Sequence, residues 1–294
     1  MVALVTELIE AGGVRGEDII LYDVTGGRNV GKPISDRIRA NTNKQFQAVK
    51  FLVGTDFDEG GRLSATPDMA NPIQFSKADV PVGYLAEQVN AAKYLINMAN
   101  LKSHTGAGVT LCAKNHYGSL IRTPPDTGYY DMHVSLPEEV HGSGHYRALV
   151  DLMGHAQMGG KTLLCLIDGL YPGVHPVEHT PRKWFTHPFN GQWASSLLAS
   201  QDPVAIDSVA FDFLWAEWND YPHMSGADDY LHEAALADHP PSGTFYDPDH
   251  AAKVTRLASL GVHEHWNNAQ EKQYSKNLGK GEGIELVSVG RSAA

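Results

Sequence analysis

Helix-like and strand-like segments alternate along the first two hundred residues, and this alternation constrains the fold more than any other feature. A helical pattern at residues 2–11 precedes apolar, strand-like runs at residues 18–23 and 48–54, with a second helix near residues 35–42 between them. Helices that connect successive strands are typical of α/β folds. We therefore predict a mixed or mostly parallel sheet with flanking helices.

The same signals continue downstream. Strands are expected at residues 94–100, 162–168 and 195–200, and helices at residues 84–92 and 146–158. Asp202 has the residue type of a helix N-cap, and Pro203 favours the first helical position, so a helix should run from there to about Trp218. Further helical patterns at residues 228–236 and 249–260 predict a mostly helical C-terminal third.

The length of the chain allows one large domain or two small ones. Of its 294 residues, 42% are hydrophobic and 19% are charged, which is ordinary for a chain that folds throughout. No internal repeat or linker forces a domain boundary. We predict a single α/β domain over residues 1–294, with a subdivision into residues 1–118 and 119–294 as the alternative.

Charge and cysteine content exclude several classes of protein. The formal net charge of −11 disfavours nucleic acid as a partner, since phosphate backbones are bound by basic surfaces. No apolar stretch approaches the roughly 20 residues that cross a bilayer, so membrane insertion is not expected. The two cysteines, Cys112 and Cys165, cannot build an iron–sulfur cluster or a zinc ribbon and are expected in the core.

The chain begins directly in a helical pattern, and residues 290–294 resemble a cloning remnant. A leader or a first strand is therefore expected to precede the helix. Such a protein would be periplasmic or otherwise exported once its leader is removed, and cytoplasmic if it has none.

One glycine-rich motif is a near match that we set aside. Residues 26–33 have the spacing of a phosphate-binding P-loop, but Pro33 stands where a serine or threonine would hold Mg²⁺. Proline also removes a backbone donor from the phosphate cradle. A glycine-rich turn into a helix is the better interpretation, with generic anion binding as the alternative.

Residues 102–118 carry the strongest functional signal, because two lysines, two histidines and an asparagine stand among small residues just past a predicted strand. If residues 109–115 are helical, the glycines before them lie at a helix N-terminus, where free amides favour an anion. Lys102 and Lys114 would add positive charge, while His104, His116 and Asn115 would contact the ligand. The alternative is that both lysines are solvated or form structural ion pairs.

Fifteen histidines are an excess for this length and make metal chemistry a hypothesis to test. His141 and His145 have the spacing of a helical metal pair, but the glycines between them disfavour a helix. His133, with His104, His116 and Asp168, forms the predicted metal-ligand set. The histidines at 232, 263 and 265 have an ordinary interpretation as solvated helix positions.

Three aspartates are candidate site residues, each with a structural alternative. Asp168 ends the clearest buried strand, a position where α/β proteins bind ligands. Asp202 and Asp207 are candidates for binding a cofactor, although capping explains Asp202 almost completely and Asp207 fits a polar helix face.

Three blocks of sequence resemble a known family. Residues 97–118, 166–169 and 200–207 are similar, in this order, to the bacterial and archaeal proteins grouped as domain of unknown function 362. The resemblance extends over about residues 18–214 and implies little chemistry. Some members have a twin-arginine export leader, and others have ferredoxin-type cysteine clusters, which this chain lacks. Members also usually begin with a strand before the helix that opens this chain.

We therefore expect a metal-assisted or lysine-assisted enzyme that acts on a small anionic molecule. Lys102 and Lys114 would bind or polarise the anion, and His104 and His116 would act as general acid or base or as ligands of a divalent metal ion, helped by Asp168. The alternative is a non-catalytic exported accessory protein that binds an anionic ligand. A redox partner or a second copy of the chain is left open as its binding partner.

Overall fold

A computed structural model describes residues 1–23, 31–53, 63–121, 135–174, 181–251 and 253–290. The chain forms two compact units, each built from several segments. The first consists of Met1–Gln74, Asp79–Lys93 and Gly118–Tyr130, and the second of Phe75–Ala78, Tyr94–Tyr117 and Asp131–Ala294. We describe each unit separately.

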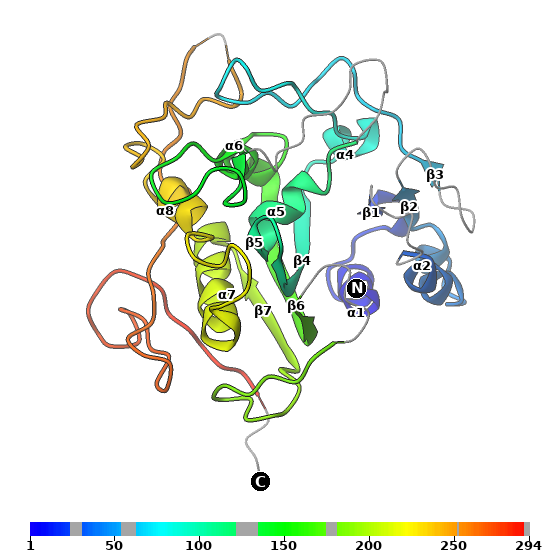
Figure 1. Ribbon diagram of the computed structural model, residues 1–294. Helices are drawn as coiled ribbons and strands as arrows, with labels where there is room; N and C mark the ends of the chain where they lie inside the picture. Colours follow the sequence, from blue (N-terminus) through cyan, green and yellow to red (C-terminus); the bar gives the residue numbers. More distant parts are fainter. Residues whose placement is uncertain (24–30, 54–62, 122–134, 175–180, 252, 291–294) are drawn as a thin grey trace. The chain divides into compact units, whose positions relative to one another are not determined.

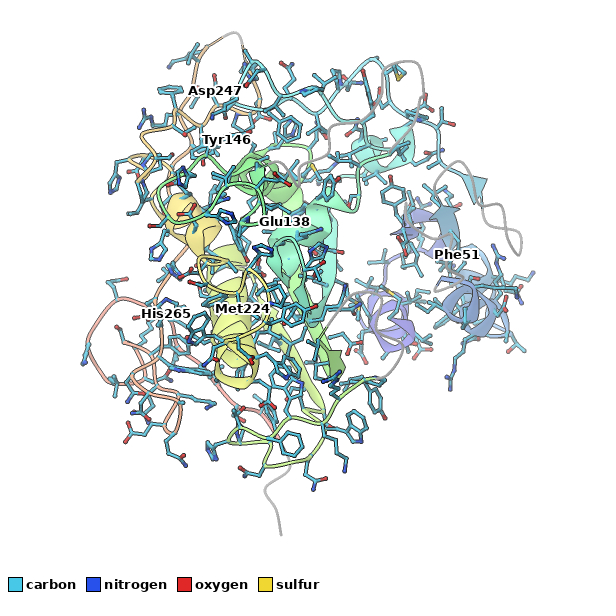
Figure 2. The ribbon with its side chains drawn as sticks, viewed as in Figure 1. Phe51, Glu138, Tyr146, Met224, Asp247 and His265 are labelled. Atoms are coloured by element: carbon cyan, nitrogen blue, oxygen red, sulfur yellow. The ribbon has the colours of Figure 1, made fainter. Side chains whose placement is uncertain are left out.

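The first unit contains a three-stranded parallel sheet. Its strands β1 (Ile20–Asp23), β2 (Lys50–Val53) and β3 (Leu63–Ser64) lie in the order β1-β2-β3. The helices of this unit are α1 (Val2–Glu10), α2 (Gly31–Arg39), α3 (Lys44–Gln47) and α4 (Glu87–Ala91) (Figure 1). Apolar side chains from α1, α2, α3 and β2, among them Phe51, form its core (Figure 2). The predicted helix–strand alternation is confirmed here.

The second unit contains a mixed four-stranded sheet in the order β5-β4-β6-β7. Its strands are β4 (Leu95–His104), β5 (Gly108–Thr110), β6 (Thr162–Gly173) and β7 (Ser196–Ser200). β4 and β6 are parallel, while β5 and β7 are antiparallel edge strands. The two sheets together confirm the predicted α/β class with parallel and mixed sheets.

The α-helices among the described residues of the second unit are α5 (Cys112–Tyr117), α6 (Ala148–Gly154), α7 (Pro203–Trp218) and α8 (Asp229–Ala235). Both α5 and α7 pack against β4 and β6 and against each other (Figure 1). α8 packs on α6 and α7. Cys112 and Cys165 are free thiols buried in this unit, as predicted.

The start of α7 confirms the predicted cap. The Asp202 side chain accepts hydrogen bonds from the backbone amides of Val204 and Ala205, at 2.9 and 2.8 Å, and Pro203 occupies the first helical turn. The prediction of helix at residues 249–260 is wrong, because the described residues there form turns and irregular chain. Helices α7 and α8 account for the helical character of the C-terminal region.

A buried arginine joins the loops around α6 and α8. The Arg147 guanidinium donates to Asp229 at 2.6 Å, and both side chains are only 1% exposed. Arg147 also donates to the carbonyl oxygens of Ser135, Val140 and Gly142. Each of its three guanidinium nitrogens thus has at least one protein acceptor, as a buried charge requires. None of the helices in the described residues is long and apolar enough to cross a membrane.

Candidate metal centre

Four metal-ligating side chains converge in the second unit. One ligand atom from each of Asp228, His232, His263 and His265 lies within 4.8 Å of the others. Among the residues that the structure describes, no other group of three or more histidine, cysteine or acidic side chains meets in this way. Two ligands come from the start of α8 and two from an extended segment that passes beside α7, where Figure 2 shows His265.

The spacing of the ligand atoms fits a tetrahedral ion. His263 Nε2 lies 3.3 Å from His232 Nε2, and Asp228 Oδ2 lies 3.5 Å from His232 Nε2 and 3.6 Å from His265 Nε2. Ligand atoms at about 2.1 Å from a tetrahedral ion are separated by roughly 3.4 Å. These three of the six separations match the edges of such a tetrahedron, and the other three are within 4.8 Å.

A hydrogen bond sets the tautomer of His263. The Ser208 hydroxyl donates its proton to the carbonyl oxygen of Val204 at 2.8 Å, one turn earlier in α7. Its oxygen then accepts from His263 Nδ1, also at 2.8 Å. With the proton on Nδ1, the Nε2 atom that faces the cluster carries a lone pair and can bind a metal ion.

Asp212 orients His265 in the same manner. The carboxylate accepts from His265 Nδ1 at 2.6 Å, and it is itself held by the hydroxyl of Tyr274 at 2.8 Å and the backbone amide of Trp266 at 3.1 Å. A carboxylate on the outer nitrogen fixes the ring and increases the basicity of the inner nitrogen. Histidines that bind metal ions commonly donate their outer N–H to a carboxylate in this way.

Local chain geometry explains why these four side chains meet. Asp228 is the residue before α8, and His232 follows four positions later, so both lie on one side of the first turn. In an extended chain, alternate residues face the same side, which pairs His263 with His265. Glu264 between them faces elsewhere and accepts from the amides of Ser275 and Ile284.

The charges of the centre depend on one another. Its hydrogen bond with Asp212, and then that with Asp228, raises the pKa of His265 to about 10. Burial and the neighbouring imidazoles lower the pKa of His263 to about 3. Although burial opposes it, hydrogen bonds with His232 and His265 hold the pKa of Asp228 below its ordinary value. Without an ion, the protonated ring of His265 lies between the carboxylates of Asp212 and Asp228, and a metal ion would compete with the proton on Nε2.

Residues 102–118 do not form the helix at residues 109–115 that the sequence analysis considered. Gly106 lies in the turn between β4 and β5, and Gly108 is the first residue of β5, while α5 begins only at Cys112. His104 Nδ1 accepts from the backbone amides of Gly106 and Ala107 at 3.0 and 3.1 Å. The conditional placement of these glycines at a helix N-terminus is therefore wrong.

The side chain of Asp207, a residue of α7, caps the start of α5. Its carboxylate oxygens accept from the amides of Cys112 and Ala113, at 2.8 and 2.9 Å, and from the hydroxyl of Tyr230 at 3.0 Å. Burial raises the pKa of Asp207 to about 6, against the effect of these donors. The amides that an external anion would use are thus taken by an internal carboxylate.

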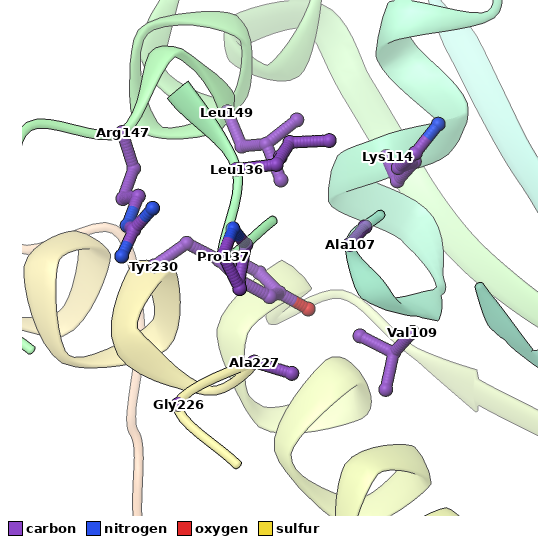
Figure 3. Close-up of a pocket in the computed structure, with 10 residues that line it drawn as sticks. All are labelled: Ala107, Val109, Lys114, Leu136, Pro137, Arg147, Leu149, Gly226, Ala227 and Tyr230. Carbon is purple, nitrogen blue, oxygen red and sulfur yellow. The ribbon is translucent and has the colours of Figure 1, made fainter. Parts of the chain in front are cut away.

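The lysines and Asn115 lie on β4 and α5. Lys102 lies on β4 opposite Thr110 of β5, and Lys114 lies on α5 with its ammonium 5.1 Å from the centre of the Tyr117 ring. Asn115 donates to Asn97 Oδ1 at 2.8 Å, which ties α5 to β4. Lys114 lines one end of a pocket and Arg147 the other (Figure 3), but the void is only about 10 Å³. That volume holds about one water molecule.

The remaining predicted residues are dispersed. Asp168, opposite Asn100 in the sheet, accepts from the amide of Leu170 at 2.9 Å. His116 is buried in α5, and burial lowers its pKa to about 4. His133 lies outside the described residues. Asp202 Oδ2 accepts from the amide of Val262 at 3.0 Å, so this predicted residue anchors the segment that leads into His263.

Two residue spacings in the sequence agree with the cluster, although they are visible only when the residues are considered in pairs. Asp228 and His232 have the i, i+4 spacing of ligands on a helix, and His263 and His265 have the i, i+2 spacing of ligands on a strand. Each pair alone is common. Only the tertiary contact of α8 with the distant segment turns two ordinary pairs into one site.

Comparison with known proteins places most of the chain in one family. No curated protein and no solved structure matches it. Residues 1–212 match the family model described as domain of unknown function (DUF362), which covers about 72% of the 294 residues. The match includes Ser208 and Asp212 but ends before all four ligands. The chain therefore belongs to the DUF362 family.

Proposed function

We propose that this protein binds a divalent first-row metal ion, zinc above all, and uses it as a Lewis acid on a small anionic substrate. The observation that carries the proposal is the convergence of Asp228, His232, His263 and His265 within 4.8 Å. Two of the imidazoles are also held in the tautomer that a metal ion requires, by Ser208 and Asp212.

The ligand types favour zinc over other ions. Three imidazoles and one carboxylate suit zinc and its neighbours, whereas magnesium and calcium prefer oxygen ligands throughout. No thiolate belongs to the cluster, which disfavours copper(I). The separations of 3.3–3.6 Å between ligand atoms also agree with the tetrahedral geometry that zinc prefers.

Solvent access supports a role in chemistry. The side chains of His232 and His265 are each 45% exposed, so an ion bound between them would face solvent on one side. A bound zinc ion would polarise a carbonyl or phosphoryl oxygen and lower the pKa of bound water. Asp228 and Asp212 would balance its charge, so that an anionic ligand meets a centre that is close to neutral. The lysine-assisted alternative has less support, because the Lys114 pocket is so small.

One observation favours a second candidate function. Four protein ligands are the usual complement of a structural zinc site, whereas catalytic sites commonly keep one position for water. A closed centre would make the protein a non-catalytic accessory protein in which zinc stabilises the C-terminal region. The two functions differ in whether an external anion can reach the ion.

Cobalt substitution should separate the two functions. The visible absorption of protein loaded with one equivalent of Co²⁺ should change when acetate or inorganic phosphate is added, because the anion enters the coordination sphere. Sodium perchlorate, which coordinates weakly, controls for ionic strength. Bound cobalt with a spectrum that neither anion alters would support the closed, accessory function and contradict the catalytic one.

The outer hydrogen bond to His265 should tune metal affinity. Asp212→Asn keeps the shape of the side chain but removes the charge that faces His265 Nδ1, so zinc should bind roughly 10- to 100-fold more weakly. Competition with a chelator of known affinity measures the change. Asp238→Asn is a matched control, because Asp238 contacts His239 Nδ1 at the same 2.6 Å outside the cluster. Equal losses in both variants would exclude a specific role for Asp212.

A further inference from the structure

A second feature of the same unit, separate from the metal centre, has the form of a ligand pocket. A cavity of about 240 Å³ lies between α5, α6, β6 and the start of α7. His116, Met153 and Cys165 line it and are at most 4% exposed, while Gly160, Gln201 and Ser259 also line it and are exposed. The cavity thus has a buried floor and a rim open to solvent. None of the four metal ligands lines it.

His116 is a polar group of this cavity whose ring forms no hydrogen bond with the described residues. Its ring is 4% exposed, and no described residue forms a hydrogen bond with either ring nitrogen. Polar groups in a protein interior almost always have a hydrogen-bond partner, which a ligand or water in the cavity would supply here. By contrast, the hydroxyl of Thr162 in the same lining donates to the carbonyl oxygen of Met158 at 2.9 Å. The imidazole therefore offers one donor and one acceptor to whatever fills the cavity.

The lining also indicates the class of ligand. Among the described residues, no lysine, arginine, aspartate or glutamate contributes to it, so a charged ligand would lose its hydration without gaining a counter-charge. Met153, Pro203 and Leu260 supply apolar walls. Burial lowers the pKa of His116 to about 4, which keeps the ring neutral at physiological pH and agrees with an uncharged ligand.

The volume of the cavity limits the size of the ligand. A dry cavity of about 150 Å³ accommodates benzene, so the larger volume here corresponds to about ten non-hydrogen atoms. We propose that the cavity binds an uncharged, partly apolar organic molecule of this size, with a hydroxyl or amide group that hydrogen bonds with His116. The proposal does not depend on the metal centre, because the two sites share no residue.

Three probes of similar shape test this assignment in the full chain. They are 4-methylphenol, its apolar analogue p-xylene and the anion 4-methylbenzoate. NMR titration should follow the methyl signal of Met153 and the imidazole signals of His116, which both lie on the floor. The phenol should shift these signals and bind about three- to tenfold more tightly than p-xylene, the usual gain from one neutral hydrogen bond. The anion should bind more weakly than either.

A variant assigns the preference to His116. In His116→Phe, 4-methylphenol should lose its advantage over p-xylene, while His239→Phe, at an exposed position, should preserve it. The proposal is overturned if neither neutral probe shifts the floor signals of the wild-type protein. It is also overturned if the anion binds as tightly as the phenol, or if the preference survives in His116→Phe. The wild-type titration decides the matter even if the variant fails to fold.

Discussion

Replacing His263 with alanine should weaken zinc binding by roughly 100- to 1,000-fold. Zinc sites with four protein ligands have apparent binding free energies of about 10–16 kcal/mol, so each ligand contributes about 2.5–4 kcal/mol, and 1.4 kcal/mol corresponds to a factor of ten. His263 is the ligand whose tautomer is fixed by Ser208 and whose Nε2 lies 3.3 Å from that of His232. Its loss therefore removes a preoriented donor. Chelator competition measures the affinity.

The matched control for this variant is His239→Ala. His239 also forms a short contact with an aspartate, but its side chain is 69% exposed and lies outside the cluster. This variant should bind zinc as the wild-type protein does. Circular dichroism of the metal-free proteins should show equal folding in both. An unchanged zinc affinity in His263→Ala would remove His263 from the site.

Replacing Arg147 with methionine should lower the free energy of unfolding by about 3–5 kcal/mol. Methionine fills much of the same volume but leaves the Asp229 carboxylate, 1% exposed, without its cation. Three carbonyl oxygens in the loop before α6 also lose their donors. Breaking a buried ion pair by removing one partner is among the largest single-residue effects known. Chemical denaturation followed by tryptophan fluorescence measures it.

Arg256→Met provides the comparison within the same unit. Arg256 donates to one backbone carbonyl, that of Asp238, and its guanidinium lies 4.5 Å from the centre of the Phe245 ring near the surface. Its replacement should cost less than about 1 kcal/mol. Equal losses for Arg147→Met and Arg256→Met would contradict the assignment of Arg147 as a buried anchor.

Local sequence signals predicted the fold well at positions where a single physical role explains the residue type. Asp202 followed by Pro203 marked the first turn of α7, because a capping carboxylate and a proline both suit positions with free amides. The apolar run that became β6 was recognised because a central strand is buried on both faces. The prediction of a helix at residues 249–260 failed, because the helical periodicity of this segment is not supported by packing.

For residues 102–118, the sequence did not reveal the contact partners. The glycines of this segment suggested that a ligand approaches the backbone, and Gly108 does admit a close neighbour at a positive φ of 75°. The neighbours are the protein's own His223 carbonyl and Ala227 side chain, 2.4 Å from where a Cβ would stand. The polar residue types were thus recognised, but their partners, such as Asp207 for the α5 amides, came from 95 residues away.

The candidate metal centre could not be predicted from spacing, because its two halves are 31 residues apart and each half has an ordinary interpretation. The chain brings them together through residues of the family region. Asp202 holds the amide of Val262, and Ser208 and Asp212 hold the rings of His263 and His265. The ligands lie beyond residue 212, where the family match ends. The centre therefore joins the C-terminal region to α7.

X-ray absorption at the zinc edge of the protein loaded with one equivalent of zinc tests the central claim most directly. We predict a first shell of nitrogen and oxygen atoms at about 2.0–2.1 Å, with outer scattering from three imidazoles. In His263→Ala, one imidazole contribution should disappear. A sulfur shell at about 2.3 Å, or a shell without imidazole scattering, would contradict the assignment of zinc to Asp228, His232, His263 and His265.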